Sequence, residues 1–339
     1  MKALVITGKD KPLELMTVDD KSAGAGQALV RVYAAALNHR DVWIQKGQYA
    51  GLKYPVIPGS DGAGVVVALA AGTAADEVAR WVGREVIIDP ALNWGHDPGF
   101  QHPTDFKILG LPDDGTLAEY VVAPLGNLVA KPLPLSFEEA AALPLAGVTA
   151  WRALMKRGRL QAGERVLITG IGGGVALFAL QFAVATGAQV YVTSGSEEKL
   201  ARAVAMGAAG GVNYKSADWV GGLRSQAGAF DVIVDGAAGD GVNDLLDLAT
   251  PGGRVVFYGG TRGNPASLVW RRIFWKQLNV LGSTMGNPED FAEMVEFVGR
   301  HSIRPVVDRV FAMEEGVAAF RHMDEAMQFG KIVVRIGSF

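Results

Sequence analysis

The sequence predicts an α/β protein in which a mostly β domain is combined with a doubly wound parallel sheet. The chain has 339 residues, which is more than a single ordinary hydrophobic core organises, so we expect two domains. Up to Pro124 the apolar runs are short and strand-like, with Gly, Pro and Asp between them. From Leu125 onward, helical and strand-like segments alternate, as they do in parallel sheets covered by helices.

Composition and charge exclude several classes of protein. With 49% hydrophobic and 20% charged residues, the chain is typical of soluble globular proteins. A net charge of -3 provides no broad cationic surface for nucleic acid or an acidic membrane. The start "MKALVITG" lacks the pattern of a secretion signal, and no apolar run approaches the roughly 20 residues that span a bilayer. We therefore expect a cytoplasmic protein that acts on a small molecule.

The chain contains no cysteine. Disulfide bonds, thiolate catalysis and every cysteine-ligated zinc site are therefore excluded.

The expected elements follow from these patterns in chain order. Strands are predicted at "KALVI", "QALVRVYAAAL", "GAGVVVAL", "REVIID" and "AEYVVA". The next part begins with a helix over "SFEEAAALPLAGVTAWRALM", a buried strand "RVLITG" and an apolar helix that ends at Gly187. Further strands are expected at "QVYVTS", "DVIVDG", "RVVFYGG" and "NVLGST", with the helices "EEKLARAVAMGA" and "GVNDLLDLA" among them. After Gly286 two amphipathic helices flank the strand "RPVVDRVF", and the closing "KIVVRI" is expected to return to the first domain.

A glycine-rich turn stands where the strand "RVLIT" passes into a helix. The segment "GIGGGVA" contains Gly170, Gly172, Gly173 and Gly174, followed by Val175. Glycines at such a position let backbone N–H groups approach a pyrophosphate at the N-terminus of a helix. Counted from Gly170, Val175 replaces the third glycine of G-x-G-x-x-G, so a plain tight turn is the alternative. The succession of strand and helix units that follows favours a dinucleotide site.

The end of the next strand bears on the choice of dinucleotide. NAD sites usually place an Asp or Glu there to bind the ribose 2'-hydroxyl, whereas NADP sites lack it and supply a cation. Here Ser194 ends the strand, the first carboxylate is Glu197, and Lys199 is within reach of a 2'-phosphate. We expect NADPH rather than NADH, although Lys199 also fits an ordinary exposed helix position.

Six segments together resemble the medium-chain dehydrogenase/reductase superfamily, and the chain is similar to its zinc-type alcohol dehydrogenase-like and quinone oxidoreductase-like branches. They are "ALNHRDVWIQKG", "PGSDGAGVV", "DGTLAEYVV", "LSFEEAAALPLAGVTAW", "GIGGGVA" and "FGKIVVRI". The resemblance implies a GroES-like catalytic domain, expected at residues 1–124 and 287–339, and a Rossmann coenzyme-binding domain, expected at residues 125–286. It also implies an active-site cleft between the two domains and assembly into dimers or tetramers.

The resemblance also implies coenzyme contacts at particular positions. Thr149 matches a residue near the nicotinamide and its ribose, and Gly259 and Gly260 follow the strand that passes the nicotinamide. Tyr214 matches a residue that flanks the adenosine phosphate, and Lys331 lies in a closing segment near the cofactor. Each of these residues also fits a turn glycine or a surface side chain.

The departures from the superfamily pattern concern zinc. Zinc members have a catalytic Cys where this chain has Asn38, a Gly-His-Glu where it has Ser60 and Asp61, and a four-cysteine lobe at residues 92–106. A catalytic zinc needs three protein ligands and an open fourth position. His39, Asp61 and His96 are the remaining groups that could gather around a metal. Because the usual ligands are missing, we expect no bound zinc and assign no metal ligands.

The expected absence of zinc changes the chemistry that is feasible. A simple alcohol is hard to oxidise without a Lewis acid that lowers the pKa of its hydroxyl. A quinone or an α,β-unsaturated carbonyl accepts hydride while its negative charge spreads to an oxygen, where hydrogen-bond donors suffice. Asn38 is the first donor candidate, followed by Ser60, Arg40 and Tyr49. Asn38 fits equally well as the N-cap of a helix at "HRDVW", with Asp41 orienting that turn.

Three functions stay open at this stage. The first is an NADPH-dependent reductase of quinones or enones. The second is a zinc-free alcohol or aldehyde oxidoreductase of the same superfamily. The third is a non-catalytic NADP(H)-binding redox sensor that retained the fold.

The segment "SLVWRRIFWKQLNVLGSTM" predicts association between copies of the chain. Trp270, Phe274 and Trp275 precede the strand expected at the edge of the parallel sheet. Exposed edges next to apolar side chains invite pairing with another chain. We expect a homodimer or a homotetramer built about twofold axes. The alternative is that the aromatic side chains pack on the core of their own domain.

Overall fold

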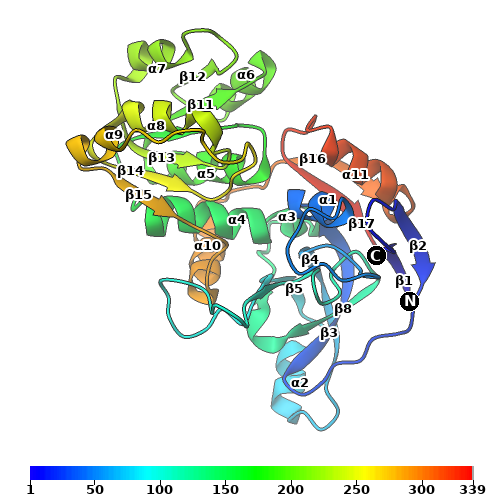
Figure 1. The fold of residues 1–339 in the computed structure, drawn as a ribbon. Helices are drawn as coiled ribbons and strands as arrows, with labels where there is room; N and C mark the ends of the chain where they lie inside the picture. The colour runs from blue at the N-terminus through cyan, green and yellow to red at the C-terminus, as the bar shows by residue number, and fades with distance from the viewer. Residues whose placement is uncertain (338–339) are drawn as a thin grey trace. The chain divides into compact units, whose positions relative to one another are not determined.

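The computed structural model describes residues 1–337 and divides into two compact units (Figure 1). Unit 1 contains Met1–Ala146 and the chain from Asn287 onward, and unit 2 contains Gly147–Gly286. The first boundary therefore lies 22 residues (146 − 124) beyond the predicted one. The second boundary lies between Gly286 and Asn287. The assignment of these units to a catalytic and a coenzyme-binding domain with the predicted bounds stays a prediction. No helix of residues 1–337 is long and apolar enough to cross a membrane.

The first boundary is displaced because the segment after Pro124 packs on unit 1. Helix α3 (Phe137–Ala142) begins with a capping box, in which the Ser136 hydroxyl and the Glu139 carboxylate bond to each other's backbone N–H. Phe137 and the alanines of α3 are buried against strands β3 and β4 of unit 1. Residues 125–146 thus complete the core of unit 1.

The segment predicted to be helical, residues 136–155, contains a break. Helix α3 ends before Pro144, which opens α4 (Pro144–Trp151), and α4 passes into a π-helical stretch (Arg152–Arg157). Proline has no backbone N–H to donate, so the hydrogen-bond pattern of the helix is interrupted at Pro144, although Leu143 keeps helical dihedral angles. The apolar periodicity continues through the break, and the segment predicted to be helical is helical in three pieces.

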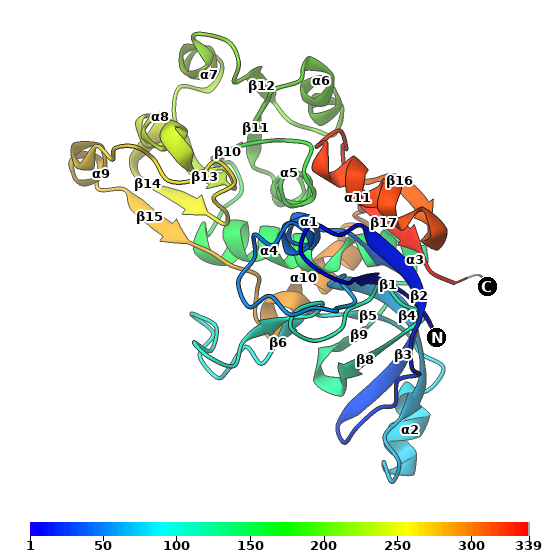
Figure 2. The same ribbon diagram turned by 45° about the vertical axis from the view of Figure 1, so that its right-hand side comes forward.

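The main sheet of unit 1 has seven strands in the order β16-β17-β3-β4-β5-β9, with β8 also paired to β3. The bounds are β3 (Gln27–Ala36), β4 (Asp61–Leu69), β5 (Glu85–Ile88), β8 (Tyr120–Pro124), β9 (Leu128–Ala130), β16 (Val307–Ala312) and β17 (Lys331–Arg335). Strand β17 runs antiparallel to β3, with Val334 opposite Ala35, so the end of the chain does return to the first unit. Helix α11 (Gly316–Asp324) lies alongside β16 and β17 in both views (Figures 1 and 2).

Smaller elements complete unit 1. Two pairs of strands form separate two-stranded sheets: β1 (Lys2–Ile6) with β2 (Leu13–Thr17), and β6 (Ala91–Leu92) with β7 (Lys107–Ile108). The remaining helices are α1 (His39–Gln45), α2 (Ala75–Trp81) and α10 (Pro288–Arg300). Alternate residues of β3, including Val30 and Val32, are fully or almost fully buried in the core, as expected for a strand that covers it with one face.

Unit 2 is a six-stranded parallel sheet in the order β12-β11-β10-β13-β14-β15, which confirms the doubly wound prediction. The strands are β10 (Arg165–Ile168), β11 (Gln189–Ser194), β12 (Gly210–Asn213), β13 (Phe230–Asp235), β14 (Ala249–Phe257) and β15 (Asn279–Gly282). The helices are α5 (Gly174–Thr186), α6 (Glu197–Ala205), α7 (Trp219–Ala227), α8 (Val242–Leu248) and α9 (Trp270–Lys276). The strand order reverses between β10 and β13, the place where open α/β sheets bind ligands at the strands' carboxyl ends.

One buried carboxyl group in unit 1 lacks a full set of partners. Asp89 follows β5 and is 1% exposed. Its Oδ1 accepts a hydrogen bond of 3.0 Å from the Ala91 N–H, whereas Oδ2 has no hydrogen-bond partner. Burial, with a smaller contribution from the charge of Asp290, raises the pKa of Asp89 to about 7.

Asp89 predicts a stability that falls with pH. Between about pH 4 and 7 the folded protein keeps the Asp89 proton and the unfolded chain loses it, so the free energy of unfolding decreases as pH rises. A shift from 3.8 to about 7 corresponds to an upper bound of roughly 4 kcal/mol across this window. Asp89→Asn is expected to flatten this dependence, measured by chemical denaturation at pH 5 and 7.5. An equal slope in wild type and variant would show that Asp89 is not the titrating group.

Candidate functional site

The start of helix α1 is held by the buried carboxylate of Asp41. Asp41 Oδ2 accepts a hydrogen bond of 2.8 Å from the Asn38 N–H, and Oδ1 accepts one of 3.2 Å from the Gly59 N–H. Burial raises the pKa of Asp41, and the neighbouring charge of Arg40 opposes that shift. Asp41 therefore ties the first turn of α1 to the loop before β4, and its contacts are those of an orienting group.

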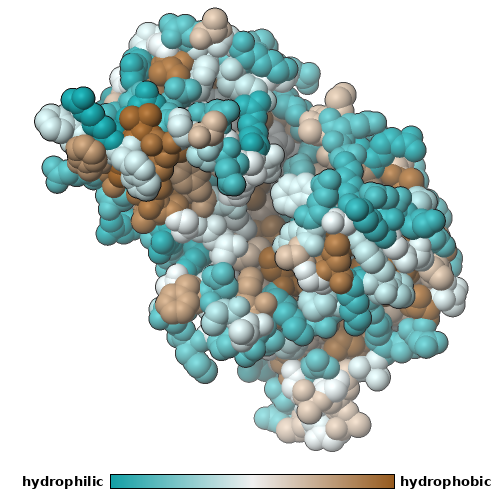
Figure 3. Space-filling view, in the orientation of Figure 1, coloured by the Kyte–Doolittle hydropathy of each residue, from teal (hydrophilic) through white to brown (hydrophobic). Residues whose placement is uncertain are grey.

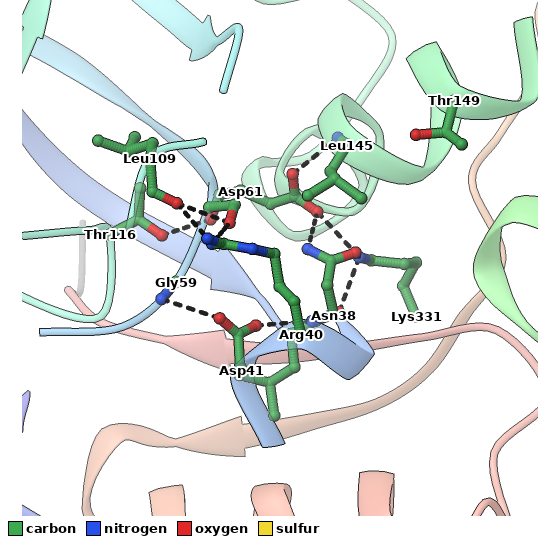
Figure 4. A network of polar contacts seen from close by, with 12 residues as sticks. Asn38, Arg40, Asp41, Gly59, Asp61, Leu109, Thr116, Leu145, Thr149 and Lys331 are labelled. Atoms are coloured by element: carbon green, nitrogen blue, oxygen red, sulfur yellow. Dashed lines mark hydrogen bonds and ion pairs between the residues drawn. The ribbon is translucent and has the colours of Figure 1, made fainter. Parts of the chain in front are cut away.

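Asn38, Asp61 and Lys331 form a buried polar group, here called the Asp61 cluster (Figure 4). Asp61 Oδ2 accepts from Lys331 Nζ at 2.8 Å and from Asn38 Nδ2 at 2.9 Å. Lys331 Nζ also donates to Asn38 Oδ1 and to the Leu37 carbonyl, both at 2.7 Å. The three donors of the ammonium group thus meet three oxygens. Asn38 is the N-cap residue of α1 by position, yet its side chain bonds within this cluster.

The second carboxylate oxygen of Asp61 is also satisfied. Oδ1 accepts a hydrogen bond of 2.7 Å from the Leu145 N–H, at the start of α4. The carboxylate is fully buried, and Lys331 is 3% exposed. A buried ion pair is stable only when its charges and remaining lone pairs are matched in this way.

Arg40, Tyr49 and Ser60 form a second group, here called the Arg40 group. Arg40 Nη1 donates to Ser60 Oγ at 2.6 Å and to the Leu109 carbonyl at 2.9 Å, and Nε donates to the Tyr49 hydroxyl at 3.4 Å. The guanidinium carbon lies 5.0 Å from the centre of the Tyr49 ring. Arg40 is 5% exposed. Among residues 1–337 no carboxylate forms an ion pair with Arg40, and its Nη2 makes no hydrogen bond.

The residues at this site do not fit a zinc ion. No three His, Cys, Asp or Glu side chains of residues 1–337 are grouped so that they could hold a metal. His39 and His96, the two histidines considered from sequence, belong to no such group. The oxygens of Asn38 and Asp61 bond to the Lys331 ammonium, and Ser60 Oγ bonds to Arg40. Of the three groups that the sequence suggested for a metal, Asp61 is thus occupied by the ammonium group of Lys331.

The glycine-rich turn of unit 2 fits a dinucleotide. Gly170 has a φ of +67° and Gly172 a φ of +122°, conformations that favour glycine. A Cβ atom at Gly170 or Gly173 would meet nothing within 4 Å, so the space beside the turn is open. Helix α5 begins with Gly174 and Val175. The first backbone N–H groups of a helix have no partner within the helix and carry partial positive charge, so they are available to an anion at this turn. These residues would hold the pyrophosphate of a bound coenzyme.

Polar side chains gather at the ends of β11 and β12. Ser194 is buried at the end of β11, where its hydroxyl contacts the Ile171 carbonyl at 3.4 Å. The Tyr214 hydroxyl and Lys215 Cε would lie 2.7 and 2.9 Å from a Cβ atom at Gly195, so both reach toward the tip of β11. Lys199 crosses the glycine-rich turn, since its Cδ would lie 2.9 Å from a Cβ at Gly172. Lys215, adjacent to Tyr214 in sequence, was not among the residues predicted for this site.

The residues expected near the nicotinamide lie elsewhere in unit 2. Thr149 is 5% exposed on α4, and its hydroxyl contacts Met285 Sδ at 3.9 Å. Gly259 and Gly260 follow β14, and a Cβ atom at Gly259 would lie only 2.8 Å from the Gly236 carbonyl oxygen. Their contacts with a coenzyme stay predictions. The same holds for Lys331, whose ammonium bonds within the Asp61 cluster of unit 1.

The Asp61 cluster predicts strong coupling between its two charges. Asp61→Asn or Lys331→Met alone leaves the other charge buried without its partner, so each is expected to lower the free energy of unfolding by about 3–5 kcal/mol. The double variant removes both charges and is expected to lose clearly less than the sum of the two single losses. Denaturant unfolding of the four proteins measures this coupling. Additive losses would contradict the proposed pairing.

Two family models match the two parts of the chain. One is described as an alcohol dehydrogenase GroES-like domain and matches residues 24–133, and the other is described as a zinc-binding dehydrogenase and matches residues 174–300. The chain is 38% identical, over 96% of its length and 95% of the relative's, to a zinc-type alcohol dehydrogenase-like protein YogA of Leptosphaeria maculans. It is also 28% identical to a quinone oxidoreductase of Rattus norvegicus, over 90% of this chain and 87% of the relative.

A solved structure agrees with these matches. A crystal structure of an NAD-dependent alcohol dehydrogenase covers 99% of this chain and 100% of its own, with 37% identity and a TM-score of 0.91. The resemblance inferred from the six sequence segments is thereby confirmed, and so is the pairing of a GroES-like domain with a Rossmann-like one. The chain belongs to the medium-chain dehydrogenase/reductase superfamily and is an NAD(P)H-dependent oxidoreductase.

Proposed function

We propose that this enzyme transfers hydride from NADPH to a quinone or an α,β-unsaturated carbonyl compound without zinc. The observation that carries the proposal is the Arg40 group. A buried guanidinium is bonded only to neutral oxygens, and its Nη2 has no hydrogen-bond partner among the described residues. Such a group is suited to bind an oxygen on which negative charge develops.

In this proposal the polar residues of unit 1 have separate roles. A bound coenzyme would supply the hydride that adds to a carbon of the substrate. The charge that reaches the substrate oxygen is stabilised by N–H donors of Arg40 and by the Tyr49 hydroxyl, while Ser60 holds the guanidinium in place. Asn38 stays oriented by the Asp61 cluster. The Asp61 and Lys331 charges cancel, so Arg40 is the cation available to the substrate.

The coenzyme contacts of the proposal lie in unit 2. The turn from Gly170 to Val175 binds the pyrophosphate, and Ser194, Lys199 and Tyr214 bind the adenosine end. Thr149, Gly259 and Gly260 line the nicotinamide end. The lack of a carboxylate at Ser194 and the position of Lys199 against the turn support NADPH over NADH.

Two observations support the quinone or enone substrate over a simple alcohol. The chain has no cysteine, and its oxygens around Asp61 bond to an ammonium group, so no Lewis acid is provided for an alcohol hydroxyl. One relative is named a quinone oxidoreductase. The second candidate, an alcohol or aldehyde oxidoreductase, is favoured by the names of other relatives, such as an alcohol dehydrogenase of Geobacillus stearothermophilus at 28% identity.

NADPH oxidation by metal-depleted protein tests the proposal. Protein dialysed against a chelator, with well under one zinc per chain by elemental analysis, is expected to reduce members of a quinone and enone panel. Arg40→Met is expected to lower kcat/KM by about 100-fold, since it removes a preorganised donor. Arg80→Met is the matched control, because Arg80 also stacks on an aromatic ring but is exposed on α2.

Other outcomes of this assay identify the alternatives. Turnover restricted to alcohols or aldehydes favours the second candidate and contradicts the proposal. Tight NADPH binding without turnover of any substrate class favours the redox sensor. Activity that appears only when zinc is added also contradicts the proposal.

We further propose that the enzyme is a homodimer, or a homotetramer built from two such dimers, joined at β15. This strand is the edge of the sheet and pairs only with β14 among the described strands. Beside it, Trp270, Phe274 and Trp275 of α9 are 68%, 65% and 73% exposed, so they do not pack in the core of their own unit. Figure 3 shows apolar atoms gathered over the part of unit 2 that carries α9 and β15. A second copy related by a twofold axis would pair the edge and cover these side chains.

Charged substitutions in this patch are expected to separate the subunits. Phe274→Glu combined with Trp275→Glu places two carboxylates where the proposal requires a dry contact. Light scattering is expected to give at least twice the 35.7 kDa chain mass for the wild type and a single chain mass for the variant. Leu133→Glu is the control, because Leu133 is 93% exposed in unit 1. A wild-type monomer at micromolar concentration would refute the dimer.

A further inference from the structure

The loop after β14 is fastened to the loop after β13. The Arg262 N–H donates to the Ala237 carbonyl at 2.9 Å, and the Gly239 N–H donates to the Gly263 carbonyl at 2.9 Å. The Arg262 Cβ would lie 2.9 Å from a Cβ at Gly239, which has a φ of +65°. These contacts fix where the Arg262 side chain begins, on the β13 side of the point where the strand order reverses.

The Arg262 side chain ends on the other side of that point. Its guanidinium carbon lies 5.2 Å from the centre of the Tyr214 ring. Tyr214 follows β12, and its N–H donates to the Ser194 carbonyl of β11 at 3.0 Å. Strands β11 and β10 lie between β12 and β13 in the sheet. The side chain therefore reaches across the carboxyl ends of the central strands to the place where β11 and β12 end.

The charges around Tyr214 suit an anion. Lys215 and Lys199 reach Gly195 and Gly172 respectively, and Arg262 adds a third cation over the ring. The side chain of Arg262 makes no ion pair and no hydrogen bond within residues 1–337, so its five N–H donors are open to a ligand. The nearby carboxylate of Glu197 accepts a hydrogen bond of 2.8 Å from Asn213 Nδ2. An arginine with open donors binds phosphate with two parallel hydrogen bonds.

We infer that Arg262 is a specificity-determining residue that binds the 2'-phosphate on the adenosine ribose of NADP(H). This inference rests on the NADPH preference in the proposed function. The pyrophosphate belongs at the turn after β10, whereas the adenosine ribose of a dinucleotide in such a sheet lies at the end of the second strand, here Ser194. Tyr214 holds the guanidinium by a cation–π contact beside that position. Arg262 thus brings a charge from one half of the sheet to a phosphate bound on the other half.

Binding of two nucleotide fragments tests the inference without turnover. Calorimetry would compare 2',5'-ADP, which carries the 2'-phosphate, with 5'-AMP, which does not. Arg262→Met is expected to weaken 2',5'-ADP about tenfold or more and 5'-AMP less than about twofold, because only the first is held by charge-assisted bonds. Arg262→Lys keeps the charge but lacks the planar guanidinium group. Its affinity for 2',5'-ADP is expected to lie between those of the wild type and of Arg262→Met.

The control is Arg309→Met, because Arg309 also stacks on an aromatic ring, Phe311, but lies in unit 1. It is expected to leave both affinities unchanged. If the wild type prefers 2',5'-ADP, Arg262→Met keeps that preference and Lys199→Ala abolishes it, the inference is wrong and the NADPH proposal stands. Equal weakening of both fragments by Arg262→Met also overturns the inference. A wild type that binds both fragments equally contradicts the NADPH preference itself.

Discussion

The buried ion pair between Asp61 and Lys331 is the constraint on which the proposed active site depends. Its two residues are 270 positions apart in sequence and begin the two strands that flank β3. In the sheet, both Asp61 and Val333 lie opposite Ala36, and Asn38 follows two residues later. A shift of either strand by one residue would turn one charge to the other face and leave its partner buried alone. The pair therefore links the register of three strands to the orientation of Asn38.

In our proposal, the same pair also determines which residue binds the substrate oxygen. All three donors of the Lys331 ammonium are used by oxygens of the chain, and an ammonium group offers no coordination position to a ligand. A substrate oxygen must therefore find its donor elsewhere. Arg40, bonded to neutral oxygens and with Nη2 open, is that donor in our proposal. In our proposal, hydrogen bonds rather than a Lewis acid stabilise the substrate oxygen, which suits acceptors whose charge is already delocalised.

Much of the fold of unit 2 could be predicted from the sequence, because its central elements have clear local signals. The β10, α5 and β11 elements have long apolar runs and a glycine stop at Gly187, whose φ of +85° fits the end of a helix. Strand β12 was missed because Gly210 and Gly211 form half of it and weaken the strand signal. The break at Pro144 was missed because the apolar periodicity continues across it.

The contacts of the site were harder to predict than its residues. From the sequence, Asn38 fits both a helix N-cap and a hydrogen-bonding group, and no local pattern distinguishes these roles. In the structure Asn38 stands at the N-cap position of α1, while its side chain bonds to Asp61. The pairing of Lys331 with Asp61 depends on β17 returning to the first sheet, and the contact of Arg262 with Tyr214 depends on the strand order. Both are long-range consequences of topology, so residue types alone do not reveal them.

The charged side chains of the two proposed sites differ in burial, and the ligands that we propose for them explain this difference. In unit 1 the charges of Asp61, Lys331 and Arg40 are buried, where water and salt screen them little. In our proposal Arg40 therefore acts strongly on an oxygen whose charge lasts only through the reaction. In unit 2, Arg262 and Lys215 are exposed and Lys199 is half-buried. Water therefore solvates these charges when no ligand is bound, and they cost little folding free energy. A phosphate carries its full charge before and after binding, and several weak, screened contacts suffice to select it while still permitting release. Strong stabilisation of a transient charge requires burial, whereas recognition of a permanent one does not.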